Sequence, residues 1–258
     1  MLNFRNTNIA FALLFLALIV TDIRFTVPFS AYLLLITCYL LLLFYGSYFV
    51  HSQFYMKTIC RADIKEKKIA ITFDDGPLEQ YTPQMLQILK TYNVKATFFC
   101  IGKNAAVNKD LLKQVHQQGH IIGSHSYMHG YWFDLLSAKN MLRELEQMHQ
   151  LVKDELGIEM KWFRPPYGVT TPNLKKAVDT MNYKAIGWNV RSMDTIAKNE
   201  TVLLQKLHRS LKPGNIFLFH DTAAITVKIL TEFIEQVQRA GYEIVPLEKL
   251  IHLQPYAD

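Results

Sequence analysis

Two long apolar runs open the chain and predict helices that lie in a membrane. Residues 29–50 carry no charged side chain for 22 positions, and residues 9–20 form an apolar run of 12. As a helix, the longer run would extend roughly 33 Å, about the thickness of the hydrocarbon core of a bilayer. A buried core helix rarely lacks a charged face over that length, so this run predicts a transmembrane helix.

The shorter run leaves two alternatives open. Its length suits the core of a signal peptide, but no clear small-x-small cleavage site follows, since the chain continues "TDIRFTVPF". It would span a membrane if it extended to Phe25, at the cost of burying or snorkelling Asp22 and Arg24. We predict that residues 1–55 form a membrane anchor with one or two transmembrane helices. A hairpin of two is favoured over one span plus an interfacial segment.

From residue 65 onward, short apolar runs alternate with amphipathic segments. The clearest helix is expected at 137–156, where apolar residues recur at steps of three and four and Gly157 follows as a C-cap glycine would. Seven strands alternating with six helices predict a parallel sheet, either open and doubly wound or a (β/α) barrel. The expected strands are 68–73, 96–101, 121–124, 162–164, 185–190, 216–219 and 243–245, and the expected helices are 82–92, 105–118, 137–156, 171–181, 200–211 and 223–240.

The composition and the absence of certain motifs argue against several classes of function. No G-x-G-x-x-G follows the first strand, which counts against a dinucleotide-binding fold. The three cysteines show neither a pairing pattern nor a metal-binding spacing, so no disulfide framework is indicated. The net charge of +6 comes from scattered basic residues without a basic-aromatic pattern, so no nucleic-acid partner is expected.

Polar motifs follow five of the predicted strands. They are "DD" at 74–75, "SHSYMH" at 124–129, "RPPYG" at 164–168, "NVRSMD" at 189–194 and "HD" at 220–221. Each is weak alone, because Asp-Asp-Gly-Pro is common in turns and His-x-x-x-His arises by chance. The carboxyl ends of parallel strands form one face of an α/β sheet, and that face carries the active site. Together the motifs predict a functional site.

The residue types suggest metal-assisted hydrolysis. One aspartate with His125 and His129 is typical of a catalytic zinc site, which keeps positions open for water or substrate. If their segment were helical, the two histidines would share a face and chelate one ion. The metal would lower the pKa of water to about 7 and polarise a carbonyl oxygen. The second aspartate would then be free to act as base, and His220 has a suitable intrinsic pKa for the acid.

The motifs "TFDDGP", "SHSYMH", "RPPYG" and "LFHD", in this order, resemble those of the polysaccharide deacetylases of carbohydrate esterase family 4, also called the NodB-homology domain. The resemblance covers a catalytic domain at residues 66–250 and implies an α/β fold, a distorted (β/α)7 barrel. It also implies a metal-dependent hydrolase that removes N-acetyl groups from an amino-sugar polysaccharide. Peptidoglycan, a chitin-like polymer and an exopolysaccharide are the candidate substrates.

The resemblance implies roles for individual residues. Asp75, His125 and His129 would bind a divalent metal, with zinc as the preferred ion. Asp74 would be the general base that takes a proton from the attacking water. Arg164 would hold Asp74 in place by a charged hydrogen bond.

Two further segments complete the implied site. The backbone N–H of Tyr167 would stabilise the oxyanion, and Pro165 and Pro166 would stiffen its loop. His220 would protonate the departing amine, and Leu218 would line the acetyl pocket.

One motif departs from the family pattern. The family commonly has a motif that ends in Asp-Trp, whereas this chain has Asp194 followed by Thr195, with Trp188 placed earlier. Asp194 is still expected to pair with His220, and Trp188 is assigned to substrate binding. The missing tryptophan leaves the shape of one groove wall open, and with it the substrate.

The expected substrate determines where we expect the catalytic domain to lie. An acetylated glycan lies outside the cytoplasm, so we expect a protein of the bacterial cytoplasmic membrane with residues 66–258 on the extracytoplasmic side. The charges argue the other way, since Arg5 precedes the first apolar run and five basic residues between 57 and 68 follow the second. Two alternatives are a deacetylase or deformylase of a lipid-linked amino sugar and, less favoured because the catalytic set is intact, a non-catalytic glycan-binding protein.

Overall fold

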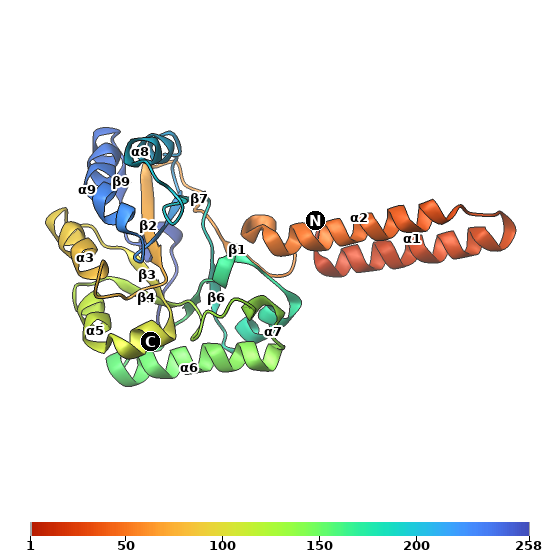
Figure 1. Ribbon diagram of the computed structural model, residues 1–258, viewed down its shortest axis with the longest axis horizontal. Coiled ribbons are helices and arrows are strands. Elements are labelled where there is room, and N and C mark those ends of the chain that lie inside the picture. The colour runs from red at the N-terminus through yellow and green to blue at the C-terminus, as the bar shows by residue number, and fades with distance from the viewer. Residues whose placement is uncertain (1, 258) are drawn as a thin grey trace.

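The two apolar runs fold into a helical hairpin that projects from the rest of the molecule (Figure 1). The computed structural model describes residues 2–257. Helix α1 (Phe4–Arg24) begins after Asn3, whose side chain accepts a hydrogen bond from a backbone N–H, and α2 (Phe29–Tyr48) begins after Pro28. Each helix is long and apolar enough to cross a membrane, and only 6% of each apolar segment is buried.

Helix α1 continues past the predicted run of residues 9–20 because Asp22 finds partners in the turn. Its Oδ1 accepts a hydrogen bond from the N–H of Val27 at 2.7 Å, and the hydroxyl of Tyr32 donates to its Oδ2 at 3.3 Å. Farther along the hairpin, the Tyr39 hydroxyl donates to Asn8 Oδ1 at 2.9 Å. The two helices are therefore joined by polar contacts as well as by apolar packing.

The remainder of the described chain forms one curled parallel sheet covered by helices (Figure 1). The strand order is β1-β6-β5-β4-β3-β2-β8-β7, and β9 pairs with the start of β2. Among residues 2–257 the edge strands β1 and β7 do not pair with each other, so the barrel stays open. The strands are β1 (Thr58–Ile59), β2 (Lys68–Asp74), β3 (Thr97–Cys100), β4 (Ile121–Ser124), β5 (Trp162–Phe163), β6 (Lys184–Ile186), β7 (Val190–Arg191), β8 (Ile216–His220) and β9 (Glu243–Ile244).

The distorted α/β barrel predicted from the sequence is thus confirmed, with nine strands in place of seven. Strand β1 was missed, and the expected strand 185–190 is two strands, β6 and β7. The chain leaves the sheet between them, because the N–H of Gly187 donates to Ile59 O at 2.8 Å and Asn189 Nδ2 donates to Asn215 Oδ1. These long-range contacts lie beyond the reach of a local apolar pattern.

The helices agree with the expected pattern, with one break. The expected helix 105–118 is divided at Asn108, whose side-chain amide donates to Pro77 O and Asn104 O, both at 3.0 Å. The short helix α10 was not predicted. The helices of this part are α3 (Thr82–Thr91), α4 (Gly102–Val107), α5 (Lys109–Gln117), α6 (Ala138–Leu156), α7 (Pro172–Thr180), α8 (Glu200–Arg209), α9 (Ala224–Arg239) and α10 (Leu247–Ile251), with 3-10 turns at Val50–Ser52, Phe133–Leu135 and Pro166–Gly168.

The two faces of the sheet have different surroundings. On β2, Ile71 and Phe73 point outward into the apolar layer under the helices, whereas Ala70 belongs to a smaller apolar cluster on the concave face. Side chains alternate along a strand, so Thr72 and Asp74 share the concave face with Ala70. The concave face is therefore apolar near the start of the strands and polar at their carboxyl ends.

Candidate active site

Asp74 and Asp75 reach the same site although they are neighbours in the chain. Asp74 ends β2 and is 3% exposed. Asp75 has a φ of 81°, in the left-handed region that aspartate tolerates, and this turns its carboxylate towards the concave face. The turn also requires Gly76, because a Cβ there would lie 1.8 Å from Asp221 Oδ2.

His125 and His129 lie in a loop after β4 and not on a helix. The condition of a helical segment is therefore not met, and the loop itself brings the two imidazoles together. Ser126 and His129 both have positive φ, 62° and 50°, and Ser126 Oγ accepts a hydrogen bond from the N–H of His129 at 3.0 Å. The two imidazole centroids lie 4.8 Å apart as a result of this fold of the loop.

A carboxylate from α6 supports the same loop. Glu144 Oε2 accepts hydrogen bonds from the N–H groups of Tyr127 at 3.0 Å and Met128 at 2.6 Å. Glu144 was not found from the sequence, because it lies on a distant amphipathic helix where a glutamate carries no motif signal. Its two bonds fix the backbone immediately before His129.

The side chains of Asp75, His125 and His129 fit a divalent metal. Their candidate ligand atoms all lie within 4.8 Å of one another, and Asp75 Oδ1 is 3.6 Å from His125 Nε2 and 3.7 Å from His129 Nε2. His125 Nδ1 is 2.8 Å from Arg164 O, so this nitrogen donates and Nε2 keeps its lone pair for a metal. Burial, aided by the nearby His129, lowers the pKa of His125 to about 3, which keeps the ring neutral as a ligand must be.

Asp74 is held by a fully buried arginine. Arg164 Nη1 donates to Asp74 Oδ1 and to Thr72 Oγ1, both at 2.7 Å, while Nε and Nη2 donate to the carbonyls of Ile186 and Gly187. The other oxygen of Asp74, Oδ2, lies 3.8 Å from His125 Nε2. Burial raises the pKa of Asp74, and the Arg164 charge opposes that shift. One carboxylate oxygen is thus fixed, and the other faces the group of candidate metal ligands.

His220 and Asp194 form a second buried pair. His220 ends β8 directly opposite Asp74 in the register of β2 and β8. Asp194 Oδ1 is 2.7 Å from His220 Nδ1, and Asp194 Oδ2 accepts bonds from the His220 N–H and the Thr226 hydroxyl. Burial acts to lower the pKa of His220, but the hydrogen bond and charge of Asp194 outweigh it and raise that pKa. The imidazole is thereby favoured in its protonated form.

The "RPPYG" segment forms a tight turn beside the histidines. Tyr167 has a φ of 57° and is 44% exposed, and its ring centroid lies 4.7 Å from that of His129. The N–H groups of Gly168 and Val169 close the turn by donating to the carbonyls of Pro165 and Pro166. These two bonds do not use the N–H of Tyr167.

Leu218 and Trp188 occupy different parts of the surroundings. Leu218 is buried and pairs with Thr72 in the sheet, so it shares the concave face with Asp74. Trp188 packs against the turn, since a Cβ on Gly168 would lie 2.6 Å from its ring, and the Arg164 guanidinium lies 5.6 Å from its ring centroid. The structure therefore brings all twelve residues singled out from the sequence to one end of the sheet or its rim.

A further carboxylic acid was visible in the "HD" motif but was given no role. Asp221 is buried and accepts a hydrogen bond from the Thr82 hydroxyl at 2.7 Å, and its Oδ1 has no hydrogen-bond partner in the described chain. Burial raises the pKa of Asp221 to about 7. Its contact with the Gly76 turn places it behind Asp75.

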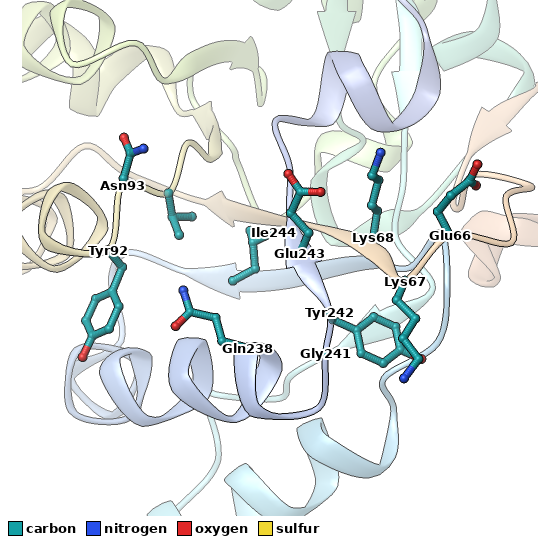
Figure 2. A pocket seen from close by; sticks show the side chains of 11 residues that line it. Glu66, Lys67, Lys68, Tyr92, Asn93, Gln238, Gly241, Tyr242, Glu243 and Ile244 are labelled. Atoms are coloured by element: carbon teal, nitrogen blue, oxygen red, sulfur yellow. The ribbon is translucent and has the colours of Figure 1, made fainter.

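A hollow of about 530 Å³ lies at the opposite end of the strands, around the start of β2 and β9 (Figure 2). Figure 2 shows Lys68 and Glu243 on these strands, with Tyr92 and Tyr242 at the rim. Its lining contains no histidine or cysteine among the described residues. Among residues 2–257, the one candidate group of metal ligands is Asp75, His125 and His129 at the carboxyl ends.

Comparisons with known proteins agree with this site. A sequence profile described as "Polysaccharide deacetylase" matches residues 61–186. A peptidoglycan-N-acetylglucosamine deacetylase of Bacillus cereus is 32% identical over 193 residues, covering 71% of this chain and 68% of that protein. The peptidoglycan-N-acetylglucosamine deacetylase PgdA of Listeria monocytogenes is 33% identical over 184 residues. The match covers 71% of this chain but only 39% of the length of PgdA.

The fold agrees with that of solved structures as well. The Bc1960 peptidoglycan N-acetylglucosamine deacetylase superposes with a TM-score of 0.72 at 27% identity, over 78% of this chain and 95% of that one. The resemblance inferred from the four motifs is confirmed by both the sequence match and the structural match. The chain belongs to the polysaccharide deacetylase family.

Proposed function

We propose that this protein is a metal-dependent hydrolase that removes N-acetyl groups from an amino-sugar glycan. The observation that carries the proposal is the meeting of three groups on one face: Asp75 with two histidines, Asp74 with Arg164, and His220 with Asp194. Two relatives are named for peptidoglycan N-acetylglucosamine, which makes that unit the first substrate to test.

A divalent metal bound by Asp75, His125 and His129, with zinc as the preferred ion, would supply a Lewis acid that lowers the pKa of water and polarises a carbonyl oxygen. Asp74 takes a proton from the attacking water with Oδ2, because Oδ1 is already bonded to Arg164. The Arg164 bond fixes the direction in which this carboxylate accepts the proton. The arrangement supplies the positioned base that hydrolysis requires.

The reaction also needs an acid that protonates the leaving amine and a hydrogen-bond donor that stabilises the oxyanion. The N–H of Tyr167, in its turn beside His129, is assigned to the oxyanion of the tetrahedral intermediate. His220 gives its proton to the departing amine when the C–N bond breaks, and Asp194 orients the ring and favours its charged form. Leu218 offers an apolar surface on the same face for the acetyl methyl group.

The proposal includes a membrane location. Both helices of the hairpin expose large apolar side chains, such as Leu13 and Leu34, that a bilayer would cover. Helix α1 is bonded to the rest of the chain, through the Phe4 N–H to Phe54 O at 3.0 Å and through Asn8 Oδ1 to the Tyr39 hydroxyl at 2.9 Å, which supports an anchor helix over a cleaved signal peptide. We assign residues 1–55 to the anchor and the following domain to the extracytoplasmic side, where an acetylated glycan is found.

The decisive test is acetate release from a panel of acetylated glycans, using the full chain purified in detergent. We expect release from peptidoglycan or N-acetylglucosamine oligomers that stops with a chelator and returns with added Zn²⁺. Metal-loaded protein that releases no acetate from any glycan, while still binding one, would favour the alternative of a non-catalytic glycan-binding protein.

A further inference from the structure

A groove of about 860 Å³ lies between the base of the hairpin and the proposed active site. One side is formed by Tyr48 and Phe49 at the end of α2 and by His51 in the following turn. The other side is formed by Tyr167 and Trp188, which also border the site. The groove is therefore shared between the anchor and the catalytic domain.

The groove reaches the catalytic groups through Tyr167. The Tyr167 ring lines the groove and lies 4.7 Å from the ring of His129, one of the three metal-binding side chains. The anchor wall precedes the family match, which begins at residue 61. A ligand in this groove would thus be recognised partly by residues that lie outside the matched family region.

Hydrogen bonds fix the two walls relative to each other. Thr170, three residues after Tyr167, donates through its N–H to Ser47 O and through its hydroxyl to Gly46 O, both at 3.1 Å. At the other helix, the N–H of Phe4 donates to Phe54 O at 3.0 Å. The groove is a built feature of the fold and does not depend on a loose linker.

The charged side chains that line the groove are basic and not acidic. Its lining includes Arg61 and Arg191 and no aspartate or glutamate among the described residues. Neither arginine forms an ion pair within residues 2–257, and Arg191 lies 6.0 Å from the centroid of the Trp188 ring. Arginine binds phosphate groups through two parallel hydrogen bonds, so this lining fits a phosphorylated ligand.

The position of the aromatic wall indicates where the rest of such a ligand lies. Tyr48 and Phe49 are the last residues of the apolar hairpin, and Tyr48 stacks on Phe44 with ring centroids 5.4 Å apart. Aromatic side chains are enriched at this level of a membrane-spanning helix, at the border between lipid and water. A lipid chain attached to a phosphate in the groove would therefore enter the bilayer beside α2.

We propose that the groove binds the diphosphate of a lipid-linked amino sugar, with the sugar at Tyr167 and the lipid chain along the hairpin. This inference rests on the proposed N-deacetylase function and narrows its substrate to a glycan precursor that is still attached to its lipid carrier. The two arginines recognise the diphosphate, and the Trp188 face packs against the first sugar.

The test measures binding of three soluble probes to the full chain in detergent by isothermal titration calorimetry. They are farnesyl-diphosphate-linked N-acetylglucosamine, the nucleotide sugar UDP-N-acetylglucosamine and the neutral tetramer of N-acetylglucosamine. We expect the lipid-linked probe to bind at least about tenfold more tightly than either of the others, since only it has both the charge and the apolar chain.

The variant Arg61→Gln/Arg191→Gln is expected to weaken binding of the lipid-linked probe about tenfold or more, because two charged hydrogen-bond donors to phosphate are lost. The matched control is Arg143→Gln/Arg209→Gln, which removes two exposed arginines from α6 and α8 outside the groove. The control should change binding by less than about twofold. The ratio of kcat/KM for the lipid-linked probe to that for the neutral tetramer should fall in the groove variant only.

Equal affinity for UDP-N-acetylglucosamine, or equal weakening in both double variants, would overturn the inference. In either case metal-dependent acetate release from the neutral tetramer would leave the proposed function standing. Arginine-dependent binding without acetate release from any probe would instead support the groove assignment and contradict the deacetylase proposal.

Discussion

Asp74 and Asp75 are adjacent in the chain, yet their carboxylates have different partners. Asp74 is buried and bonded to Arg164 at 2.7 Å, whereas Asp75 is half-buried and lies between the two histidines. A carboxylate that neutralises an arginine is poorly placed as a metal ligand, and one that faces two neutral imidazoles is well placed. The surroundings of each side chain therefore support one role for each aspartate.

Substitution at these positions should separate metal binding from turnover. Asp74→Asn is expected to retain the metal but to lower kcat by roughly 10² to 10⁴, because the amide cannot accept the proton. His125→Ala is expected to lose both metal and turnover, since one ligand is removed. Metal content is measured by mass spectrometry on purified protein, and kcat by acetate release.

The two variants serve as controls for each other. Equal metal content with equal residual rates would contradict the division of roles between Asp74 and His125. Circular dichroism of both proteins would distinguish a failed site from a failed fold.

The His220–Asp194 pair predicts a change in the pH profile. Burial opposes protonation of His220, but Asp194 raises its pKa above the ordinary value, so the acid form persists to higher pH. The rate that depends on this acid falls as pH rises through that pKa. Asp194→Asn removes the charge, so the high-pH limb of kcat should move to lower pH, with a lower maximal rate.

Thr226→Ala provides the comparison for this shift. It removes a hydrogen bond to Asp194 Oδ2 but leaves the 2.7 Å contact between Asp194 Oδ1 and His220. A pH limb that stays at the wild-type position in Asp194→Asn would rule out His220 as the proton donor for the amine.

At the scale of elements, loops at the carboxyl ends of strands bring the site together. The loop that carries both histidines has two residues with positive φ and is supported by Glu144 from α6. Helix α6 is thereby tied to the loop after β4 that carries the two candidate metal ligands. The position of His129 is thus supported by α6, although the sequence of α6 shows an apolar stripe and no sign of this role.

Removing this support should weaken metal binding without removing a ligand. Glu144→Ala is expected to reduce metal affinity roughly 10- to 100-fold, because the N–H groups of Tyr127 and Met128 lose their acceptor and the loop loosens. Glu144→Gln keeps one acceptor oxygen and should have a smaller effect. Competition with a chelator of known affinity measures both, and unchanged affinity in Glu144→Ala would mean that the loop holds its shape alone.

Local patterns predicted the elements well where packing and pattern agree. The strands at 68–73 and 121–124 and the helix at 137–156 appear within about one residue of the expected bounds, since their apolar spacing matches their buried faces. The break between β6 and β7 and the break at Asn108 depend on side-chain amides that reach distant carbonyls or amides. Glu144 was not predicted from the sequence for the same reason: its hydrogen-bond partners are far away in the sequence and come close only in the folded protein.

At the scale of the whole molecule, the hairpin and the domain form a single structure with the site close to their junction. The "RPPYG" turn is bonded to the end of α2 through Thr170. Basic residues gather at this junction, including Arg5 and Lys57, whereas Arg24 lies near the tip of the hairpin. The positive-inside rule would place the junction in the cytoplasm, whereas the proposed glycan substrate requires the extracytoplasmic side.

A reporter at the C-terminus resolves this conflict. We expect alkaline phosphatase fused after residue 258 to be active and a fluorescent protein at the same place to stay dark, with the chain resistant to alkaline carbonate extraction. The reverse pattern would place the catalytic domain in the cytoplasm. Release by carbonate would show that the hairpin is not embedded in the bilayer.

The hydrogen bonds between the hairpin and the domain also set the distance between the proposed catalytic groups and the membrane surface. The segment between α2 and β1 is bonded to its neighbours, for example through Gln53, whose side chain exchanges two hydrogen bonds with the backbone of Thr58. With the hairpin in a bilayer, the catalytic groups would stay at a constant height above the lipid surface. Such an enzyme cannot follow a mature polymer outward through a thick wall. It would modify only the newest material, in a thin layer at its site of synthesis.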